Sequence, residues 1–191
     1  MVIDSLRLFL LLGLLLHKAV WEVMKFGQQR QAAPSEPASP VVALTKFIKI
    51  AILIGILLQT VCPEILPISS EPHGLVQVGT ALFTIGLTLA IVARIQLGRQ
   101  WSDIEVGSVA ADHAIIDRGV YGLIRHPIYS GDLIMLTGLE LALNSWLVLG
   151  VAILMAAVYW KAGKEERKLA AELPGYRQYQ ERTKRFVPFV V

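Results

Sequence analysis

The strongest constraint on the fold is a run of almost unbroken apolar sequence from Tyr129 to Tyr159. A helix that crosses a bilayer upright needs about 20 residues, so this run is too long for one such span. Asn144 and Ser145 lie near its middle, just after Glu140, and favour a turn there. The run predicts a tight hairpin of helices at 130–143 and 146–161. One long kinked helix is the alternative.

Three further apolar runs come earlier, at about residues 3–24, 41–61 and 75–97. The hydrophobic fraction of 54% is too high for a soluble domain and indicates a membrane protein. We interpret the first run as a retained span. A cleaved signal peptide is the alternative, but the basic residues follow this run rather than precede it. The predicted fold class is therefore an all-α integral membrane protein of about five transmembrane helices, with a C-terminal helical hairpin and a cytoplasmic helical tail.

Short polar segments separate these helices. Residues 27–40 are rich in Pro, Ala, Ser and Gln and predict a flexible, solvated linker, whereas 63–74 reads as a short turn. Gly79 and Gly86, two turns apart in the third run, are compatible with close helix packing. We divide the chain into N-terminal transmembrane helices (1–62) and a region that carries the polar motifs (63–191).

Basic residues set the expected topology. Segment 62–74 and the hairpin tip contain no Lys or Arg, whereas residues 25–30, 98–126 and 161–191 contain several. This alternation places the N-terminus outside and puts both 98–126 and the tail 161–191 on the cytoplasmic side. The acidic residues of the long segment are expected to be solvated loop charges: Asp103, Glu105, Asp112 and Asp117.

Metal and nucleic-acid sites are not expected. Cys62 is the single cysteine and the four histidines are scattered, so we assign no metal. The net charge of +3 is too modest to suggest nucleic acid. We interpret His113 as a surface residue and His17, beside Lys18, as an interface residue.

A polar phrase, YGLIRHPIYSG at 121–131, stands where the long apolar run begins. In one interpretation Pro127 occupies the first helical turn, Arg125 extends to lipid headgroups and Tyr129 belongs to an aromatic belt. In the other, the free N–H groups of the helix start, together with Arg125, form a site for a carboxylate or phosphate.

The tail carries a second set of polar residues. Glu165 and Glu166 directly follow the last span, and KEERKLAAE also allows ordinary i, i+4 ion pairs. Tyr176, Tyr179 and Arg182 follow at three-residue spacing and are predicted to share one helix face. Acids, aromatics and a basic residue on one side of a bilayer suit a ligand that carries both charge signs and a flat ring.

These segments together resemble the isoprenylcysteine carboxyl methyltransferase family. The resemblance rests on LGRQWS at 97–102, GVYGLIRHPIYSG at 119–131, EERKL at 165–169 and YRQYQERTKRFVP at 176–188, in the family's order. It covers about half of the chain, and the first two spans match nothing specific. GVY stands where Gly-Pro-Tyr is frequent, and LPGY replaces a frequent Phe-Gly.

The resemblance implies S-adenosylmethionine as cofactor and a lipophilic or lipidated acceptor. It places the following residues at the cofactor: His126, Tyr129, Gly131, Glu165, Tyr176 and Tyr179. In this assignment the imidazole and the helix start suit the cofactor's carboxylate, a glutamate suits its ammonium and aromatic rings suit its sulfonium. Arg125, Glu166 and Arg182 are the candidates for holding the acceptor.

The expected reaction is direct displacement at the methyl carbon, with the carboxylate of a prenyl-cysteine-like substrate as the favoured acceptor. A carboxylate is already an anion and needs no general base, so orientation supplies most of the rate gain. Three alternatives remain open. They are N-methylation of a lipid amine with Glu165 or Glu166 as base, an NADPH-dependent membrane reductase with Arg182, Lys184 and Arg185 on a phosphate, and a non-enzymatic scaffold.

Overall fold

The computed structural model describes residues 4–29, 40–62, 65–100 and 114–189. Over these ranges the protein is helical, in the order α1 (Ser5–Gln29), α2 (Pro40–Val61), α3 (His73–Leu97), α4 (Pro127–Ala142), α5 (Val148–Glu172) and α6 (Tyr176–Arg182). Two 3-10 turns, η1 (Gly98–Gln100) and η2 (Gly119–Gly122), lie between α3 and α4. The predicted all-α class is confirmed.

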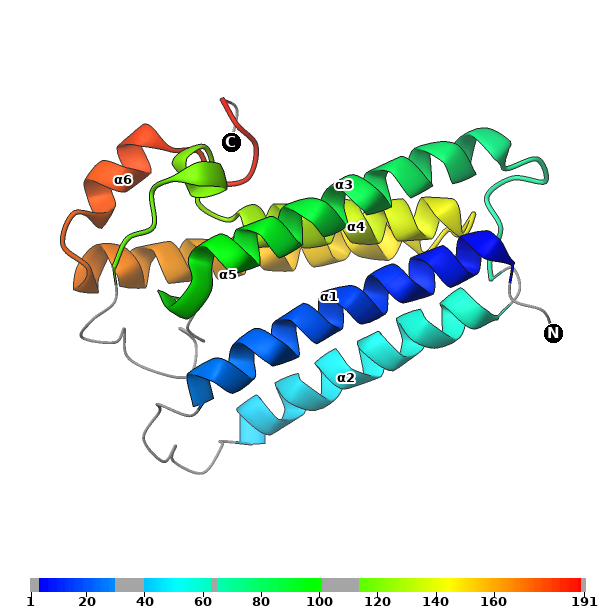
Figure 1. Cartoon of the computed structure of the whole chain (residues 1–191), viewed down its shortest axis with the longest axis horizontal. Helices are drawn as coiled ribbons and strands as arrows, with labels where there is room; N and C mark the ends of the chain where they lie inside the picture. Colours follow the sequence, from blue (N-terminus) through cyan, green and yellow to red (C-terminus); the bar gives the residue numbers. More distant parts are fainter. Residues whose placement is uncertain (1–3, 30–39, 63–64, 101–113, 190–191) are drawn as a thin grey trace.

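Helices α3 and α4 form the centre of the molecule and lie side by side over their length (Figure 1). Glycines allow this close approach: a Cβ atom on Gly86 would lie 2.2 Å from the backbone nitrogen of Met135, and one on Gly79 would lie 2.2 Å from that of Ala142. Gly131 and Gly138 of α4 face Ala90 and Phe83 of α3 in the same way. The close packing predicted for Gly79 and Gly86 is therefore confirmed.

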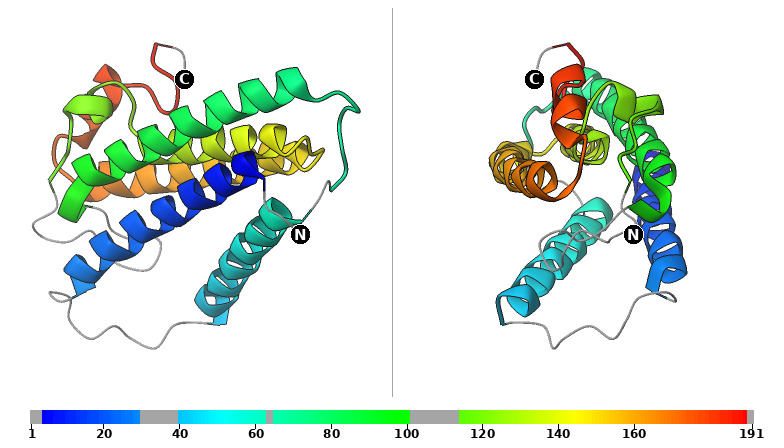
Figure 2. Two further views of the ribbon diagram at one scale, coloured as in Figure 1. Left: turned by 45° about the vertical axis from the view of Figure 1, so that its right-hand side comes forward. Right: turned by 90° about the vertical axis from the view of Figure 1, so that its left-hand side faces the viewer.

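The apolar core lies between α1, α3 and α4. Its fully buried members are Leu10 of α1, Phe83 of α3 and Leu139 of α4. Helix α5 lies against α4. Helix α2 contacts α1, and near its C-terminal end it also reaches α4, where Gln59 Nε2 donates to Glu140 Oε2 at 2.7 Å (Figure 2).

The predicted hairpin is confirmed, and the single kinked helix is excluded. Helix α4 ends at Ala142 and α5 begins at Val148. Asn144 turns the chain between them with φ of 54°, in the left-handed region that asparagine tolerates. Its side chain bonds both backbone groups of Ser69, donating to the carbonyl at 2.7 Å and accepting from the N–H at 3.0 Å. Helix α5 continues eleven residues beyond the expected end at 161, so the tail begins as a helical extension.

The number of membrane spans stays a prediction. Judged by length and composition within the described ranges, α3 is one helix that could cross a membrane, and Ile50–Val61 of α2 is apolar but shorter. The outer faces of α2 and α5 nevertheless carry exposed apolar side chains, among them Ile52 at 53% and Ile153 at 76% exposure. Contiguous apolar surface of this kind is typical of a lipid or protein contact.

Two predicted segments lie partly outside the described residues. Of the expected linker, residues 30–39 are not described, whereas residues 27–29 belong to α1 and Pro40 begins α2. Of the long polar segment, residues 101–113 are not described, and these include Asp103, Glu105, Asp112 and His113.

Candidate functional site

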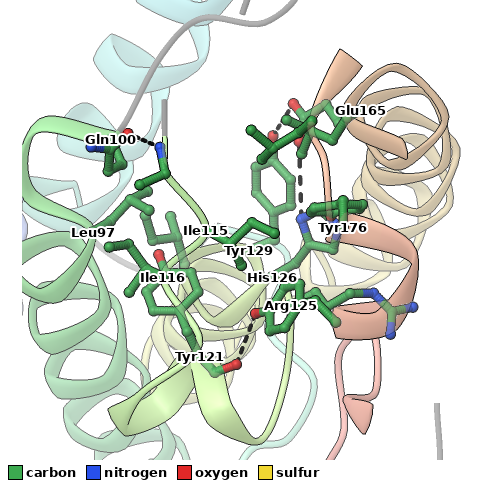
Figure 3. A pocket seen from close by; sticks show the side chains of 15 residues that line it. Leu97, Gln100, Ile115, Ile116, Tyr121, Arg125, His126, Tyr129, Glu165 and Tyr176 are labelled. Carbon is green, nitrogen blue, oxygen red and sulfur yellow. Dashed lines mark hydrogen bonds and ion pairs between the residues drawn. The ribbon is translucent and has the colours of Figure 1, made fainter. Parts of the chain in front are cut away.

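A pocket opens where the end of α3 meets η2, the start of α4, the end of α5 and α6 (Figure 3). The empty space between these elements is about 780 Å³, which includes open solvent at its mouth. The part of this space that the centres of water-sized molecules can reach is about 140 Å³. Both sets of polar residues singled out from the sequence contribute to the lining.

One end of the pocket is acidic and aromatic. The hydroxyl of Tyr129 on α4 donates to Glu165 Oε1 on α5 at 2.6 Å, and His126 Nδ1 lies 3.9 Å from Glu165 Oε2. The His126 and Tyr129 rings stack with centroids 5.4 Å apart. Pro127 occupies the first turn of α4, as predicted, and so projects these two side chains from the helix start. This end offers a carboxylate, an imidazole and a ring face to a ligand.

The carboxylate of Glu166 faces a different set of partners. It accepts from Arg125 Nε at 2.8 Å and from Arg185 Nη2 at 2.6 Å, and it lies 3.1 Å from His126 Nε2. Burial by itself would raise the pKa of Glu166, but hydrogen bonds from His126, Arg185 and Arg125 outweigh it and hold the pKa well below the usual range. Glu166 is therefore an enclosed anion that joins α5 to the start of α4 and to the tail.

Arg125 clamps the tail against the start of α4. Its Nη1 atom donates to the carbonyl of Gln180 at 3.1 Å and also to that of Thr183. Backbone bonds extend the clamp, because the N–H of Arg125 donates to Lys184 at 2.8 Å and that of His126 donates to Arg185 at 3.0 Å. Arg125 lines the pocket, but these bonds occupy its guanidinium.

Helix α6 covers the pocket with two buried tyrosines. The rings of Tyr176 and Tyr179 meet edge to face with centroids 5.7 Å apart. The Tyr179 hydroxyl donates to the carbonyl of Tyr121 at 2.8 Å, which ties α6 to η2. Burial raises the pKa of both phenols, so they stay neutral at physiological pH.

Two predicted site residues lie elsewhere. Arg182 is on the surface, where its Nη2 atom pairs with Asp117 Oδ2 at 3.1 Å. Asp117 is thus an exposed loop charge, as predicted, and it pairs with Arg182. Gly131 faces Ala90 of α3, where it serves helix packing, and it does not line the pocket. Of the three cations named for a nicotinamide phosphate, Arg182 pairs with Asp117 and Arg185 pairs with Glu166.

Sequence reasoning missed part of the α3 side of the pocket. Leu97, Gln100, Ile115, Ile116 and Tyr121 line it. The sequence around the two isoleucines does not mark them as pocket residues, because single apolar residues are common in polar segments. Tyr121 could have been recognised, since it belongs to segment 119–131, which supports the family resemblance.

His17, which we predicted to be an interface residue rather than a ligand, contacts α4 and its own helix. Its Nε2 atom lies 3.0 Å from Asp132 Oδ1 on α4, and its ring stacks on Trp21. This pair fastens α1 to α4 about one helical turn from Tyr129.

The sequence profile of the family described as phospholipid methyltransferase matches residues 75–174. Among curated proteins, the cobalt-zinc-cadmium resistance protein CzcN of Cupriavidus metallidurans is 31% identical over 113 residues, which are 58% of this chain and 51% of that protein. The protein-S-isoprenylcysteine O-methyltransferase of Schizosaccharomyces pombe is 27% identical over 112 residues, which are 56% of this chain and 46% of that protein. The chain spans about half the length of these two relatives.

A solved structure shares the fold. It is the eukaryotic intramembrane Ras methyltransferase ICMT, an isoprenylcysteine carboxyl methyltransferase, which superposes with a TM-score of 0.62 at 19% identity. The superposition covers 92% of this chain and 63% of that protein. The resemblance predicted from the motifs is confirmed.

Proposed function

The chain belongs to the phospholipid methyltransferase family, and from this premise we propose that it is an integral membrane enzyme that transfers a methyl group from S-adenosylmethionine to a lipophilic acceptor. The observation that carries the proposal is the polar end of the pocket, where Glu165, Tyr129 and His126 meet beside apolar walls. The proposed topology keeps the N-terminus outside and the pocket on the cytoplasmic side.

The residues at this end fit the donor's charged groups. Glu165 would hold its ammonium, and His126 with the first-turn N–H groups of α4 would hold its carboxylate. The face of Tyr129 would lie toward the sulfonium, and Tyr176 and Tyr179 would cover the adenine. When bound, the donor supplies an electrophilic methyl group. The protein's own part is to orient the acceptor in line with that methyl and to exclude water.

We assign Arg125 and Glu166 a positioning role, which departs from the acceptor role expected from the sequence. Their mutual bond, and the bonds of Arg125 to the tail, fix the wall from which His126 projects. Arg182, paired with Asp117 outside the pocket, is proposed to take no part.

The favoured acceptor is the carboxylate of a prenyl-cysteine-like substrate. The fission yeast relative, named an S-isoprenylcysteine O-methyltransferase, supports this choice. An amine on a phospholipid is the second candidate, supported by the description of the matching family. An amine acceptor must lose a proton, and Glu165 is the pocket carboxylate that could take it.

Calorimetry on the purified protein in detergent tests the proposal, with S-adenosylhomocysteine and NADPH as parallel titrants. Micromolar binding of S-adenosylhomocysteine alone, followed by methylation of a prenylated cysteine or of an aminophospholipid, is the expected result. Binding of NADPH alone would make the protein a reductase. If the protein binds neither ligand, the result would favour the non-enzymatic scaffold.

A further inference from the structure

One face of α5 changes its chemistry along the helix, from apolar through aromatic to cationic. Leu149, Ile153 and Trp160 are 60%, 76% and 64% exposed, and Lys164 and Arg167 follow them and are also exposed. At about 100° per residue these five side chains fall within a sector of about 60°, so they form one line, which we call the α5 stripe. Helix α5 lies at the edge of the bundle, and the stripe faces outward from the described helices (Figure 2).

The dimensions of the α5 stripe match one leaflet of a bilayer. Leu149 and Trp160 are about 16 Å apart along the helix axis, and half of the hydrocarbon core measures about 15 Å. Tryptophan is enriched where the hydrocarbon meets the headgroups. Lys164 comes about 6 Å beyond Trp160, which is the depth of the headgroup layer. The stripe therefore presents apolar side chains to acyl chains and cations to headgroups.

The two cations of the stripe lack a carboxylate in their own helix. The positions three and four residues from Lys164 and from Arg167 hold no Asp or Glu, and within the described residues neither side chain forms an ion pair. Lys164 Nζ instead lies 3.4 Å from the ring centroid of Trp160. Lys161, on another face of α5, does have a partner, because its Nζ lies 3.8 Å from Glu165 Oε1. Two like charges three residues apart repel each other, so an anion placed between Lys164 and Arg167 would be stabilised by both.

A hollow beside the stripe offers room for a headgroup. Trp160 and Arg167 of α5 line it together with Arg185 of the tail, and its empty space is about 770 Å³, open solvent included. Glu166 also lines the hollow, but two guanidinium groups face this single carboxylate, those of Arg125 and Arg185. Positive charge therefore remains at the hollow after the internal ion pairs are counted, and an anionic headgroup complements it.

We propose that the α5 stripe and this hollow bind an anionic phospholipid from the leaflet on the pocket side. The phosphate contacts Lys164 and Arg167, and an acyl chain lies along Leu149 and Ile153. The lipid is distinct from the methyl acceptor, because the hollow and the candidate pocket share no lining residue. The inference uses the membrane location of the proposed function and does not depend on its reaction.

Native mass spectrometry of the full chain in detergent tests the proposal. The protein is titrated with phosphatidylglycerol and, separately, with phosphatidylcholine of the same acyl chains, and the Kd of the first bound lipid is measured. We expect the wild type to prefer phosphatidylglycerol. The double variant Lys164→Gln/Arg167→Gln should raise the Kd for phosphatidylglycerol about 30-fold and leave that for phosphatidylcholine within about twofold, because each cation near a membrane surface contributes about fivefold.

Two matched variants accompany this measurement. Arg118→Gln/Arg177→Gln removes the same charge from exposed positions outside α5 and should bind both lipids as the wild type does. Lys164→Arg/Arg167→Lys keeps both charges and should keep the preference. Equal wild-type affinity for the two lipids would overturn the proposal, and so would an equal loss of affinity in the Arg118→Gln/Arg177→Gln variant.

The water-soluble headgroup anion separates a lipid site from a simple anion site. Glycerol 3-phosphate should not displace phosphatidylglycerol at equal concentration, because it lacks the acyl chains that the apolar end of the stripe contacts. Displacement at equal concentration would show an anion site without a lipid and would overturn the assignment. A wild type that binds phosphatidylglycerol selectively but not S-adenosylhomocysteine would overturn the proposed function and support this inference.

Discussion

Glu165 and Glu166 are neighbours in α5, but their carboxylates belong to separate clusters. Glu165 accepts the Tyr129 hydroxyl at 2.6 Å on the pocket side, whereas Glu166 is enclosed by Arg125, Arg185 and His126. Successive helix residues differ by about 100° in direction, so adjacent acids cannot face one ligand from the same side. His126 contacts both clusters and thereby couples the pocket to the enclosed anion.

Glu165→Gln should weaken binding of S-adenosylhomocysteine. The amide keeps the size of the side chain but loses the charge that pairs with the ligand's ammonium, so we expect about a 10- to 100-fold higher Kd by calorimetry. Glu181→Gln, an exposed change on α6, is the control. An unchanged Kd in Glu165→Gln would remove this residue from the donor site.

Glu166→Gln should destabilise the fold. The substitution leaves Arg125, whose side chain is 10% exposed, without its ionic partner. Breaking a buried ion pair in this way costs about 3–5 kcal/mol. Thermal unfolding followed by tryptophan fluorescence in detergent checks the result. Full thermal stability combined with lost ligand binding would show that Glu166 contacts the ligand directly.

The stability contributed by Glu166 should depend on pH. Its pKa is lowered in the folded state, so its contribution is fully present above the unfolded value of about 4.3 and is lost as the pH falls below it. Between about pH 5 and pH 3, the melting temperature of the wild type should therefore fall more steeply than that of Glu166→Gln. Parallel curves for the two proteins would contradict the assigned pKa direction.

Gly86→Ala should disrupt the packing of α3 on α4. The new Cβ would lie 2.2 Å from the backbone nitrogen of Met135, and backbone cannot yield as a flexible side chain does. Overpacking of this kind costs about 1–3 kcal/mol, which unfolding in detergent would show. Gly150→Ala is the matched control, since nothing lies within 4 Å of a Cβ there. Equal stability of the two variants would refute the close approach.

Arg182→Ala should leave methylation and ligand affinity within about twofold of the wild type. The side chains of Arg182 and Asp117 are 64% and 49% exposed, and ion pairs of this kind contribute about 0–1 kcal/mol. A large loss of turnover in this variant would restore the acceptor role expected from the sequence.

The hairpin and the start of α4 could be predicted from the sequence because each depends on local chemistry. Asn144 tolerates the left-handed turn, and Pro127 suits a helix start. The prediction that Arg182 shares one helix face with Tyr176 and Tyr179 is wrong, and the reason is geometric. Three residues fall about 60° short of a full helical turn, so a position six residues on is rotated by about 120°. Tyr176 and Arg182 consequently face different ways, the first buried and the second exposed.

The role of Arg125 required the tertiary structure. Arginine in a helix-start motif is as suitable for a ligand anion as for a carboxylate of the same chain, and the motif does not distinguish them. The deciding partners, Glu166 and the carbonyls near Thr183, lie 41 and 58 residues away. That the Tyr121 hydroxyl has no hydrogen-bond partner among the described residues likewise follows from the tertiary structure alone.

The glycine contacts between α3 and α4 bear on how the pocket could change shape. If either helix slid along the other, a side chain would move into space that Gly79, Gly86 or Gly131 leaves for backbone. The two helices should therefore move as one rigid body, and so should the parts of the pocket attached to them. Relatives that use other acceptors would then have to differ mainly in the wall formed by η2, while the donor end built from α4, α5 and α6 stays the same.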